Sequence, residues 1–211
     1  MTVSFEIRLC ENPVCGLRYP LKKGHPFGER CPICLGGTII VLTQELSSEP
    51  TITPDQPLFR LEGLLDNIRS AWNVGAIFRT ADCFGVNKLF LCGITPTPEN
   101  QSLVKTALGA DKTVQWEYSP NALATATRIK KEGAHLWALE QDPRAVPVYT
   151  NFQPDEMPIV LIVGNEVSGV DPELLDICER IVYIPMLGKK RSLNVEVAFG
   201  AALSAIRTTN R

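Results

Sequence analysis

Beyond residue 57 the sequence alternates short apolar runs with helix-length amphipathic stretches, and this alternation constrains the fold more than any other feature. The apolar runs have the length of strands and cover residues 59–65, 88–92, 113–117, 135–139, 159–163 and 181–184. The stretches between them predict helices over residues 74–84, 102–108, 121–132, 172–178 and 195–207, with Asp171 as the cap of the fourth. Such alternation is typical of an α/β domain whose mostly parallel sheet has helices on both faces.

The composition of the sequence changes twice before that domain. Residues 1–45 hold two pairs of cysteines and a β-branched run, and they predict a small separate module. Residues 46–57 are rich in proline and polar side chains, which is typical of an exposed linker. We therefore predict a module over 1–45, a linker over 46–57 and the α/β domain over 58–211.

The cysteines of the first module have the spacing of a metal site. Cys10 and Cys15 form one close pair, and Cys31 and Cys34 form a second after fifteen intervening residues. Two such pairs place four thiolates tetrahedrally around one zinc ion, and a module this small needs a metal to fold. Two alternatives stay open, namely four reduced cysteines without a ligand role and His25 in place of one thiolate. Such a zinc-ribbon-like module indicates a partner without saying whether it is RNA, DNA or protein.

The other three cysteines, Cys83, Cys92 and Cys178, lie in apolar surroundings and are predicted to be small core residues. The odd total of seven argues against a disulfide framework.

No apolar run is long enough to cross a bilayer, and the first residues lack the pattern of a secretory signal, so we expect a cytoplasmic protein. The formal charge of −2 neither supports nor excludes a nucleic-acid partner.

Three segments of the α/β domain carry polar side chains where strands end or helices begin. Asn73 is predicted to cap the following helix, and Arg79 is placed to hold a phosphate. Glu166 lies between two glycines in a loop after an apolar run. Ser192 and Asn194 follow a basic loop and introduce the last helix. Each segment alone is explained by capping, a turn or an exposed arginine, and the chain lacks the glycine-rich motifs of dinucleotide and nucleoside-triphosphate sites.

Taken together, the three segments resemble the motifs of the SpoU/TrmH family of SPOUT methyltransferases. The first motif resembles Asn73-Val-Gly-Ala-Ile-Phe-Arg79-Thr, the second Gly164-Asn-Glu-Val-Ser-Gly169, and the third Ile184-Pro-Met followed by Ser192-Leu-Asn194-Val. Order and spacing both match over residues 58–207, and the segment 105–110 is similar to a further family feature.

The resemblance implies a C-terminal trefoil knot, a homodimer, and S-adenosylmethionine bound between the knot loops. The residues that it places at the cofactor are Leu139, Glu140, Gly164, Asn165, Gly169, Ile184, Met186 and Leu193. The residues that it places at the reaction are Asn73, Arg79, Glu166, Ser192 and Asn194, with Arg79 facing the methyl donor held by the other subunit. The implied reaction is methylation of a ribose 2′-hydroxyl in tRNA or rRNA.

The chemistry of that reaction favours an electrostatic role for Arg79. The protein has to align the hydroxyl with the activated methyl group, and alignment alone lowers a barrier by several kcal/mol, roughly. A guanidinium with a pKa above about 12 is a poor base, so we expect it to anchor a phosphate. Two rival hypotheses stay open. One is a non-catalytic RNA-binding or ribosome-assembly factor that retains the fold, and the other is a protein-interaction module in which the zinc ribbon binds the partner and the larger domain only binds the cofactor.

Overall fold

The computed structural model describes residues 3–25, 29–46, 59–152, 155 and 157–209, and the chain divides into two units, Met1–Asp55 and Gln56–Arg211. All but the first residue of the predicted linker lies outside the described residues. No helix in these ranges is long and apolar enough to span a bilayer.

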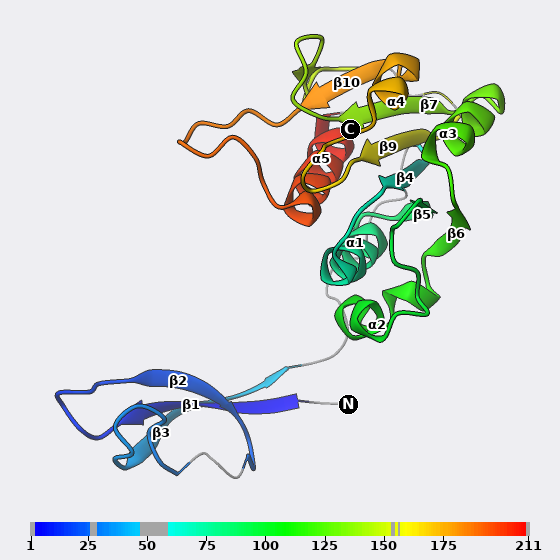
Figure 1. Ribbon diagram of the computed structural model, residues 1–211. Helices are drawn as coiled ribbons and strands as arrows, with labels where there is room; N and C mark the ends of the chain where they lie inside the picture. Colours follow the sequence, from blue (N-terminus) through cyan, green and yellow to red (C-terminus); the bar gives the residue numbers. More distant parts are fainter. Residues whose placement is uncertain (1–2, 26–28, 47–58, 153–154, 156, 210–211) are drawn as a thin grey trace. The chain divides into compact units, whose positions relative to one another are not determined.

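The smaller unit is a three-stranded antiparallel sheet (Figure 1). Its strands are β1 (Val3–Cys10), β2 (Arg18–Lys22) and β3 (Thr38–Leu46), in the order β2-β1-β3. The first cysteine pair begins at the end of β1, and the second pair comes shortly before β3. The loops that hold both pairs therefore connect the strands of this sheet.

The larger unit contains a seven-stranded sheet in which each described strand pair is parallel. Its order is β6-β5-β4-β9-β7-β10-β8. The strands are β4 (Leu61–Asp66), β5 (Val86–Cys92), β6 (Gln115–Ser119), β7 (His135–Leu139), β8 (Val146–Pro147), β9 (Ile159–Val163) and β10 (Arg180–Tyr183). Because β4, β9, β7 and β10 are neighbours and run the same way, their carboxyl ends meet at one edge of the sheet.

Helices cover both faces of this sheet (Figure 1). They are α1 (Ala71–Cys83), α2 (Gln101–Ala107), the 3₁₀ helix η1 (Ala110–Lys112), α3 (Ala122–Lys131), α4 (Pro172–Ile177) and α5 (Val195–Thr209). Apolar side chains of α1 and α5 pack with one face of the strands, and those of α3 and α4 pack with the other. Burying both faces explains why the central strands β4 and β9 are apolar along nearly their whole length.

The α/β class, the six predicted strands and the five predicted helices are confirmed, with ends that shift by up to three residues. The two-residue strand β8 and the helix η1 were not predicted. The capping of α4 by Asp171 is confirmed, because its carboxylate accepts the backbone N–H of Glu173 at 2.8 Å. The implied knot stays a prediction.

Two local predictions were wrong. The helix α1 begins at Ala71 and is capped by Ser70, so Asn73 lies inside the first turn rather than at the cap. The sequence offers two cap-forming side chains three residues apart, and the contacts of the folded chain decide between them. Cys83 is exposed at the end of α1, whereas Cys92 is buried and Cys178 half-buried as expected.

Candidate functional site

A cavity of about 440 Å³ lies at the carboxyl edge of β9, β7 and β10. Three segments that are far apart in the sequence line it, and each begins with the last residue of one of these strands. They contribute Leu139 to Gln141 from β7 onward, Val163 to Val167 and Gly169 from β9 onward, and Tyr183, Ile184, Met186, Arg191 to Val195 and Ala198 from β10 onward. The cavity is therefore built from loops at the edge where open α/β sheets hold their ligands.

All eight residues that the family resemblance implies at the cofactor line this cavity: Leu139, Glu140, Gly164, Asn165, Gly169, Ile184, Met186 and Leu193. Glu166, Ser192 and Asn194 line it as well. Sequence reasoning missed Gln141, Val163, Val167, Tyr183, Arg191, Val195 and Ala198. Six of the seven lie next to a predicted residue or at the end of a strand, and position was their only signal, whereas Ala198 lies inside α5 and had no such signal.

Glycines shape the loop after β9. A Cβ atom on Gly164 would lie 2.2 Å from the carbonyl carbon of Gly169, so this close approach of two backbone segments excludes a side chain. Gly169 has a φ of +75°, which side chains disfavour, and its backbone N–H bonds to the carbonyl of Asn165 at 2.9 Å. The Glu140 carboxylate accepts the N–H of Val170 at 3.0 Å and ties this loop to the end of β7. The close approach of Gly164 and Gly169 and the hydrogen bond from Val170 to Glu140 therefore fix the conformation of this loop.

Glu166 binds the start of α1. Its carboxylate accepts the backbone N–H groups of Arg69 at 2.9 Å and Ser70 at 3.2 Å, and the side-chain amide of Asn73 at 2.9 Å. Partial burial acts to raise the pKa of Glu166, but these hydrogen bonds outweigh it and hold the pKa below the ordinary value of 4.5. The carboxylate is therefore ionised at neutral pH and helps to fix where α1 begins.

Asn73 joins Glu166 to the start of α5. The Oδ1 atom of Asn73 accepts the side-chain amide of Asn194 at 3.0 Å. The Oδ1 atom of Asn194 in turn accepts the backbone N–H of Glu196 at 2.9 Å, which makes Asn194 the cap of α5. The three sequence motifs therefore meet in one hydrogen-bonded group of three side chains.

Arg79 lies apart from this group. It is exposed on α1 and is not among the residues that line the cavity. The adjacent Thr80 donates to the carboxylate of Glu196 at 2.8 Å, so this part of α1 is attached to α5. A single chain therefore brings together Asn73, Glu166, Ser192 and Asn194 but leaves Arg79 outside the cavity.

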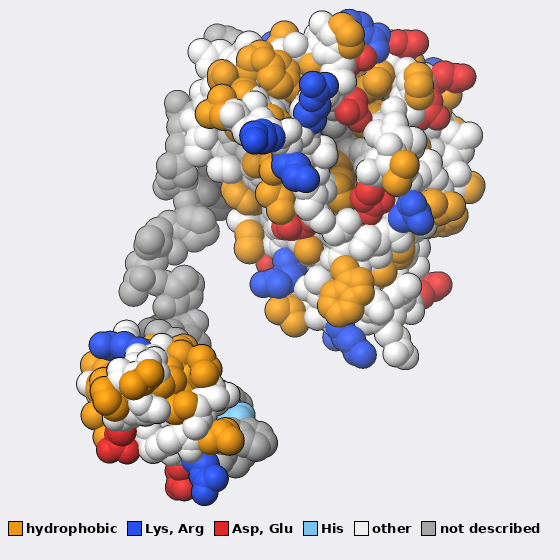
Figure 2. Space-filling view, turned by 60° about the vertical axis from the view of Figure 1, so that its left-hand side comes forward, with side chains coloured by type: hydrophobic (Ala, Val, Ile, Leu, Met, Phe, Trp, Pro, Cys, Tyr) orange, Lys and Arg blue, Asp and Glu red, His pale blue; other side chains and the backbone are white. Residues whose placement is uncertain are grey.

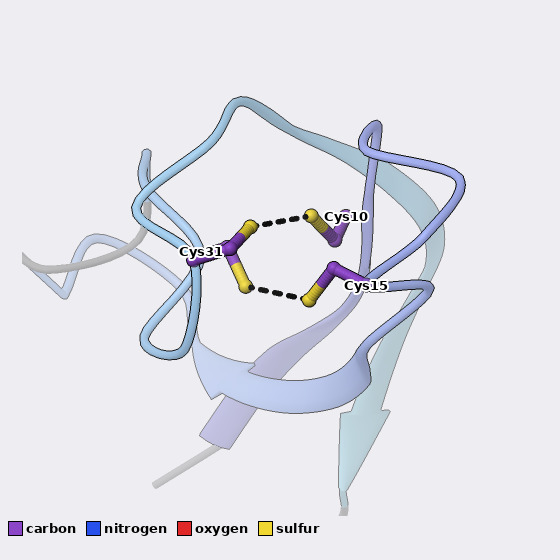
Figure 3. Close-up of side chains that lie close together, drawn as sticks. Cys10, Cys15 and Cys31 are labelled. Carbon is purple, nitrogen blue, oxygen red and sulfur yellow. Dashed lines mark hydrogen bonds between the residues drawn. The ribbon is translucent and has the colours of Figure 1, made fainter.

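The four N-terminal cysteines form a second candidate site, in the smaller unit. Their sulfur atoms all lie within 4.8 Å of one another, with 3.4 Å between Cys10 and Cys34 and 3.7 Å between Cys15 and Cys31. Figure 3 shows the side chains of Cys10, Cys15 and Cys31 turned toward one another between the two loops. None of the four is in a disulfide. This arrangement of thiols is suited to bind one metal ion.

The larger unit matches proteins of known families. The profile of the SpoU rRNA Methylase family matches residues 62–204. The chain is 33% identical over 142 residues to the tRNA (guanosine(18)-2′-O)-methyltransferase of Aquifex aeolicus, covering 65% of this chain and 64% of that protein. It is 31% identical over 144 residues to the 23S rRNA (guanosine-2′-O-)-methyltransferase RlmB of Neisseria meningitidis, covering 68% of this chain and 56% of that protein.

Solved structures of RNA-modifying enzymes also match this chain. The crystal structure of an AdoMet-bound rRNA methyltransferase from Sinorhizobium meliloti matches with a TM-score of 0.66 and 27% identity, over 72% of this chain and 57% of that one. The TrmH/SpoU tRNA modifying enzyme of A. aeolicus matches with a TM-score of 0.61 and 30% identity, over 73% and 76%. The chain spans between about half and two thirds of the length of the curated relatives named above.

Proposed function

Since this chain belongs to the SpoU rRNA methylase family, we propose that it transfers a methyl group from S-adenosylmethionine to a ribose 2′-hydroxyl of tRNA or rRNA. The observation that carries this proposal is the cavity at the carboxyl edge of the sheet, because all eight residues expected at the cofactor line it. The names of its relatives support both substrate classes, since one acts on tRNA and another on 23S rRNA.

The cavity suits the cofactor in size and chemistry. Its volume of about 440 Å³ falls within the range of small-molecule sites, and its wall mixes apolar and polar side chains. Leu139, Ile184, Met186 and Leu193 would hold the flat adenine ring by apolar contact. The backbone groups of the loop from Gly164 to Gly169 would hold the polar parts. When bound, S-adenosylmethionine supplies a methyl group already activated by a positively charged sulfur.

The residues around the cavity then have to align the ribose hydroxyl. We propose that Asn73, Glu166, Ser192 and Asn194 position the hydroxyl and the cofactor. The hydrogen bonds of Asn73 to Glu166 and Asn194 support this, because they restrict the rotamers of all three side chains before any ligand binds. Arg79 is proposed to hold the phosphate beside the target ribose, since a guanidinium pairs well with phosphate and keeps its proton.

We propose further that two copies of the chain form the complete site. Arg79 is exposed and outside the cavity of its own chain, so a second copy is needed to bring an Arg79 to each cofactor. Large apolar side chains are exposed next to the hydrogen-bonded group, with Trp72 63% exposed beside Asn73 and Val197 49% exposed near the start of α5. Contact with a second copy would remove these side chains from water.

The cysteine cluster is proposed to hold a structural zinc ion. Four sulfur atoms at about 2.3 Å from a tetrahedral zinc lie about 3.8 Å from one another, and the two distances of 3.4 and 3.7 Å are close to that value. The backbone N–H groups of Cys34 and Ile33 lower the pKa of Cys31, whereas burial raises the pKa of Cys10, so the thiols of the cluster differ in how readily they ionise. We also propose that the protein acts in the cytoplasm, because its proposed substrates are tRNA and rRNA.

Methyl transfer from labelled S-adenosylmethionine tests the proposed reaction. The substrates are separated tRNA and rRNA from cells that lack the gene, and the proteins are the wild type, Arg79→Ala and the control Lys131→Ala. Lys131 is exposed at the end of α3 and does not line the cavity at the sheet edge. We expect label in a 2′-O-methyl nucleoside of one RNA class with the wild type and the control, and its loss with Arg79→Ala.

The same experiment decides against the proposal in one case. Binding of the cofactor without transfer to either RNA class would favour a non-catalytic RNA-binding or ribosome-assembly factor.

Sedimentation of the wild type at several concentrations tests the homodimer separately, and a monomer at all of them would contradict it.

A further inference from the structure

The smaller unit lies outside the residues that the family profile matches, so its role has to come from its own surface. The two faces of its sheet differ. Side chains alternate along a strand, and directly paired residues on neighbouring strands point to the same face. The register of β1 with β2 and β3 therefore assigns each side chain to one face or the other.

One face is covered by the cysteine loops. It carries Glu6, Arg8 and Cys10 of β1, of which Glu6 and Cys10 are buried. The hydroxyl of Tyr19, which is paired with Arg8, donates to the backbone carbonyl of Arg30 at 3.4 Å, so the second cysteine loop contacts this face. Glu6 and Arg8 form an ion pair of 2.9 Å. This side of the sheet is interior along β1, whereas Ile40 on β3, which is paired with Arg8, is 50% exposed.

The opposite face is open among the residues that the structure describes. Its middle row is Phe5, Ile7 and Leu9, which are half-buried. The row on β2 is Arg18, Pro20 and Lys22, all exposed. The row on β3 is Ile39, Leu42 and Gln44, and Ile39 and Leu42 are each 47% exposed. In Figure 2 hydrophobic side chains gather over the surface of the smaller unit.

The two faces differ in charge. The open face carries two cations and no acid among its nine residues, whereas the opposite face carries Glu6, Glu45 and Arg8 by register. The formal charge of the whole chain is −2, so this separation of charge does not follow from an excess of basic residues. An apolar surface with an aromatic ring and two cations along one edge is complementary to nucleobases and phosphates.

We propose that this open face binds a single-stranded segment of the RNA substrate, with phosphates at Arg18 and Lys22 and unstacked bases on Phe5 and its aliphatic neighbours. The proposal rests on the proposed function, because it identifies the macromolecule on this face as the RNA that the larger unit modifies. An acidic peptide would also satisfy the cations. RNA is favoured by the reaction proposed for the other unit, which needs a means of selecting its substrate.

The test measures the affinity of the full chain for a fluorescent oligouridylate and for total tRNA as a function of salt. Arg18→Glu/Lys22→Glu is expected to lose at least about tenfold in affinity at low salt. The slope of log affinity against log salt concentration is expected to fall by about 1.4, since each single-strand phosphate contact contributes roughly 0.7. Leu42→Ser is expected to weaken binding without changing that slope, because it removes apolar contact only.

A matched pair of single variants assigns the effect to this face. Lys22→Glu is compared with Lys131→Glu, an exposed lysine of the larger unit with the same change in charge. Both must keep the metal content and the circular dichroism of the wild type. A loss confined to Lys22→Glu supports the proposal, whereas an equal loss in both variants, or unchanged RNA affinity in the double variant, overturns it.

The outcome is separate from that of the methyl-transfer experiment. If the wild type binds RNA through Arg18 and Lys22 but methylates neither RNA class, the proposed reaction fails and the RNA-binding face stands. If methyl transfer is observed while the double variant binds RNA as the wild type does, the reaction stands and this face has another partner.

Discussion

The side-chain amide of Asn73 donates a 2.9 Å hydrogen bond to Glu166, which lies 93 residues further along the chain. The same asparagine accepts the amide of Asn194, a further 28 residues beyond Glu166. Glu166 follows β9, Asn194 precedes α5, and Asn73 lies in the first turn of α1. Because two of the three line the cavity and the third holds them, a change at any one is expected to reach the cofactor site.

Replacing Glu166 by glutamine tests this connection. The glutamine keeps the shape of the side chain but turns one acceptor oxygen into a donor, which then faces the N–H groups of Arg69, Ser70 or the Asn73 amide. We expect the free energy of unfolding in urea to fall by about 1 kcal/mol and the affinity for S-adenosylmethionine to fall with it. Glu99→Gln, at an exposed position away from the cavity, is the control. Equal effects of both substitutions would refute the connection.

The loop after β9 should tolerate no side chain at Gly164. A Cβ atom there would lie 2.2 Å from backbone atoms of Gly169, and backbone cannot rotate away as a side chain does. We expect Gly164→Ala to displace the loop and to weaken binding of S-adenosylmethionine by at least about tenfold, as measured by calorimetry. Gly188→Ala is the matched control, because its Cβ would meet no atom within 4 Å. Wild-type affinity in Gly164→Ala would show that the loop adapts.

Removal of one thiol should release the metal from the smaller unit. Cys34 is exposed, so Cys34→Ser creates no cavity in a core, yet it takes one of four sulfur ligands away. We expect one zinc per chain in the wild type by elemental analysis, and a marked loss in Cys34→Ser. Cys83→Ser, at another exposed cysteine outside the cluster, should keep its zinc. Absence of zinc from the wild type would contradict the proposed site.

The charge of His135 is expected to make the stability of the larger unit fall as the pH rises. Hydrogen bonds to Asp155 at 2.9 Å and to Glu179 at 2.7 Å raise the pKa of His135 above its ordinary value of 6.5. A histidine whose pKa is raised by folding stabilises the fold fully below its unfolded pKa, and this contribution is lost as the pH rises through the folded pKa.

The stability difference between the wild type and His135→Asn should therefore be larger at about pH 5.5 than at about pH 8.5. We expect it to stay below about 1 kcal/mol, because the histidine side chain is 34% exposed and the pair is screened by water. Urea unfolding at the two pH values measures it. A difference that does not change with pH would mean that folding does not shift the pKa of His135.

The sequence was sufficient to predict the parallel sheet for a physical reason, whereas the family resemblance named eleven of the eighteen residues that line the cavity. Strands buried on both faces have to be apolar along their length, and residues 159–163 show this directly in the sequence. The hydrogen bonds between Asn73, Glu166 and Asn194 could not be predicted from any local pattern, because they depend on how three distant segments meet in the fold. The error at the start of α1 has the same origin, since Glu166 binds the N–H of Ser70 and so helps to fix the helix start there.

Asn194 has two roles that one pair of substitutions separates. Its Oδ1 atom caps α5 by accepting the N–H of Glu196, and its amide donates to Asn73. Asn194→Asp keeps the cap, since aspartate is as good an N-cap residue, but loses the donor to Asn73. Asn194→Ala loses both. We expect Asn194→Ala to lower the free energy of unfolding by about 1 kcal/mol and Asn194→Asp to leave it nearly unchanged. Both should reduce methyl transfer, since neither holds Asn73. If Asn194→Asp transferred methyl groups at the wild-type rate, the cap alone would account for Asn194, and its place in the proposed reaction would be lost.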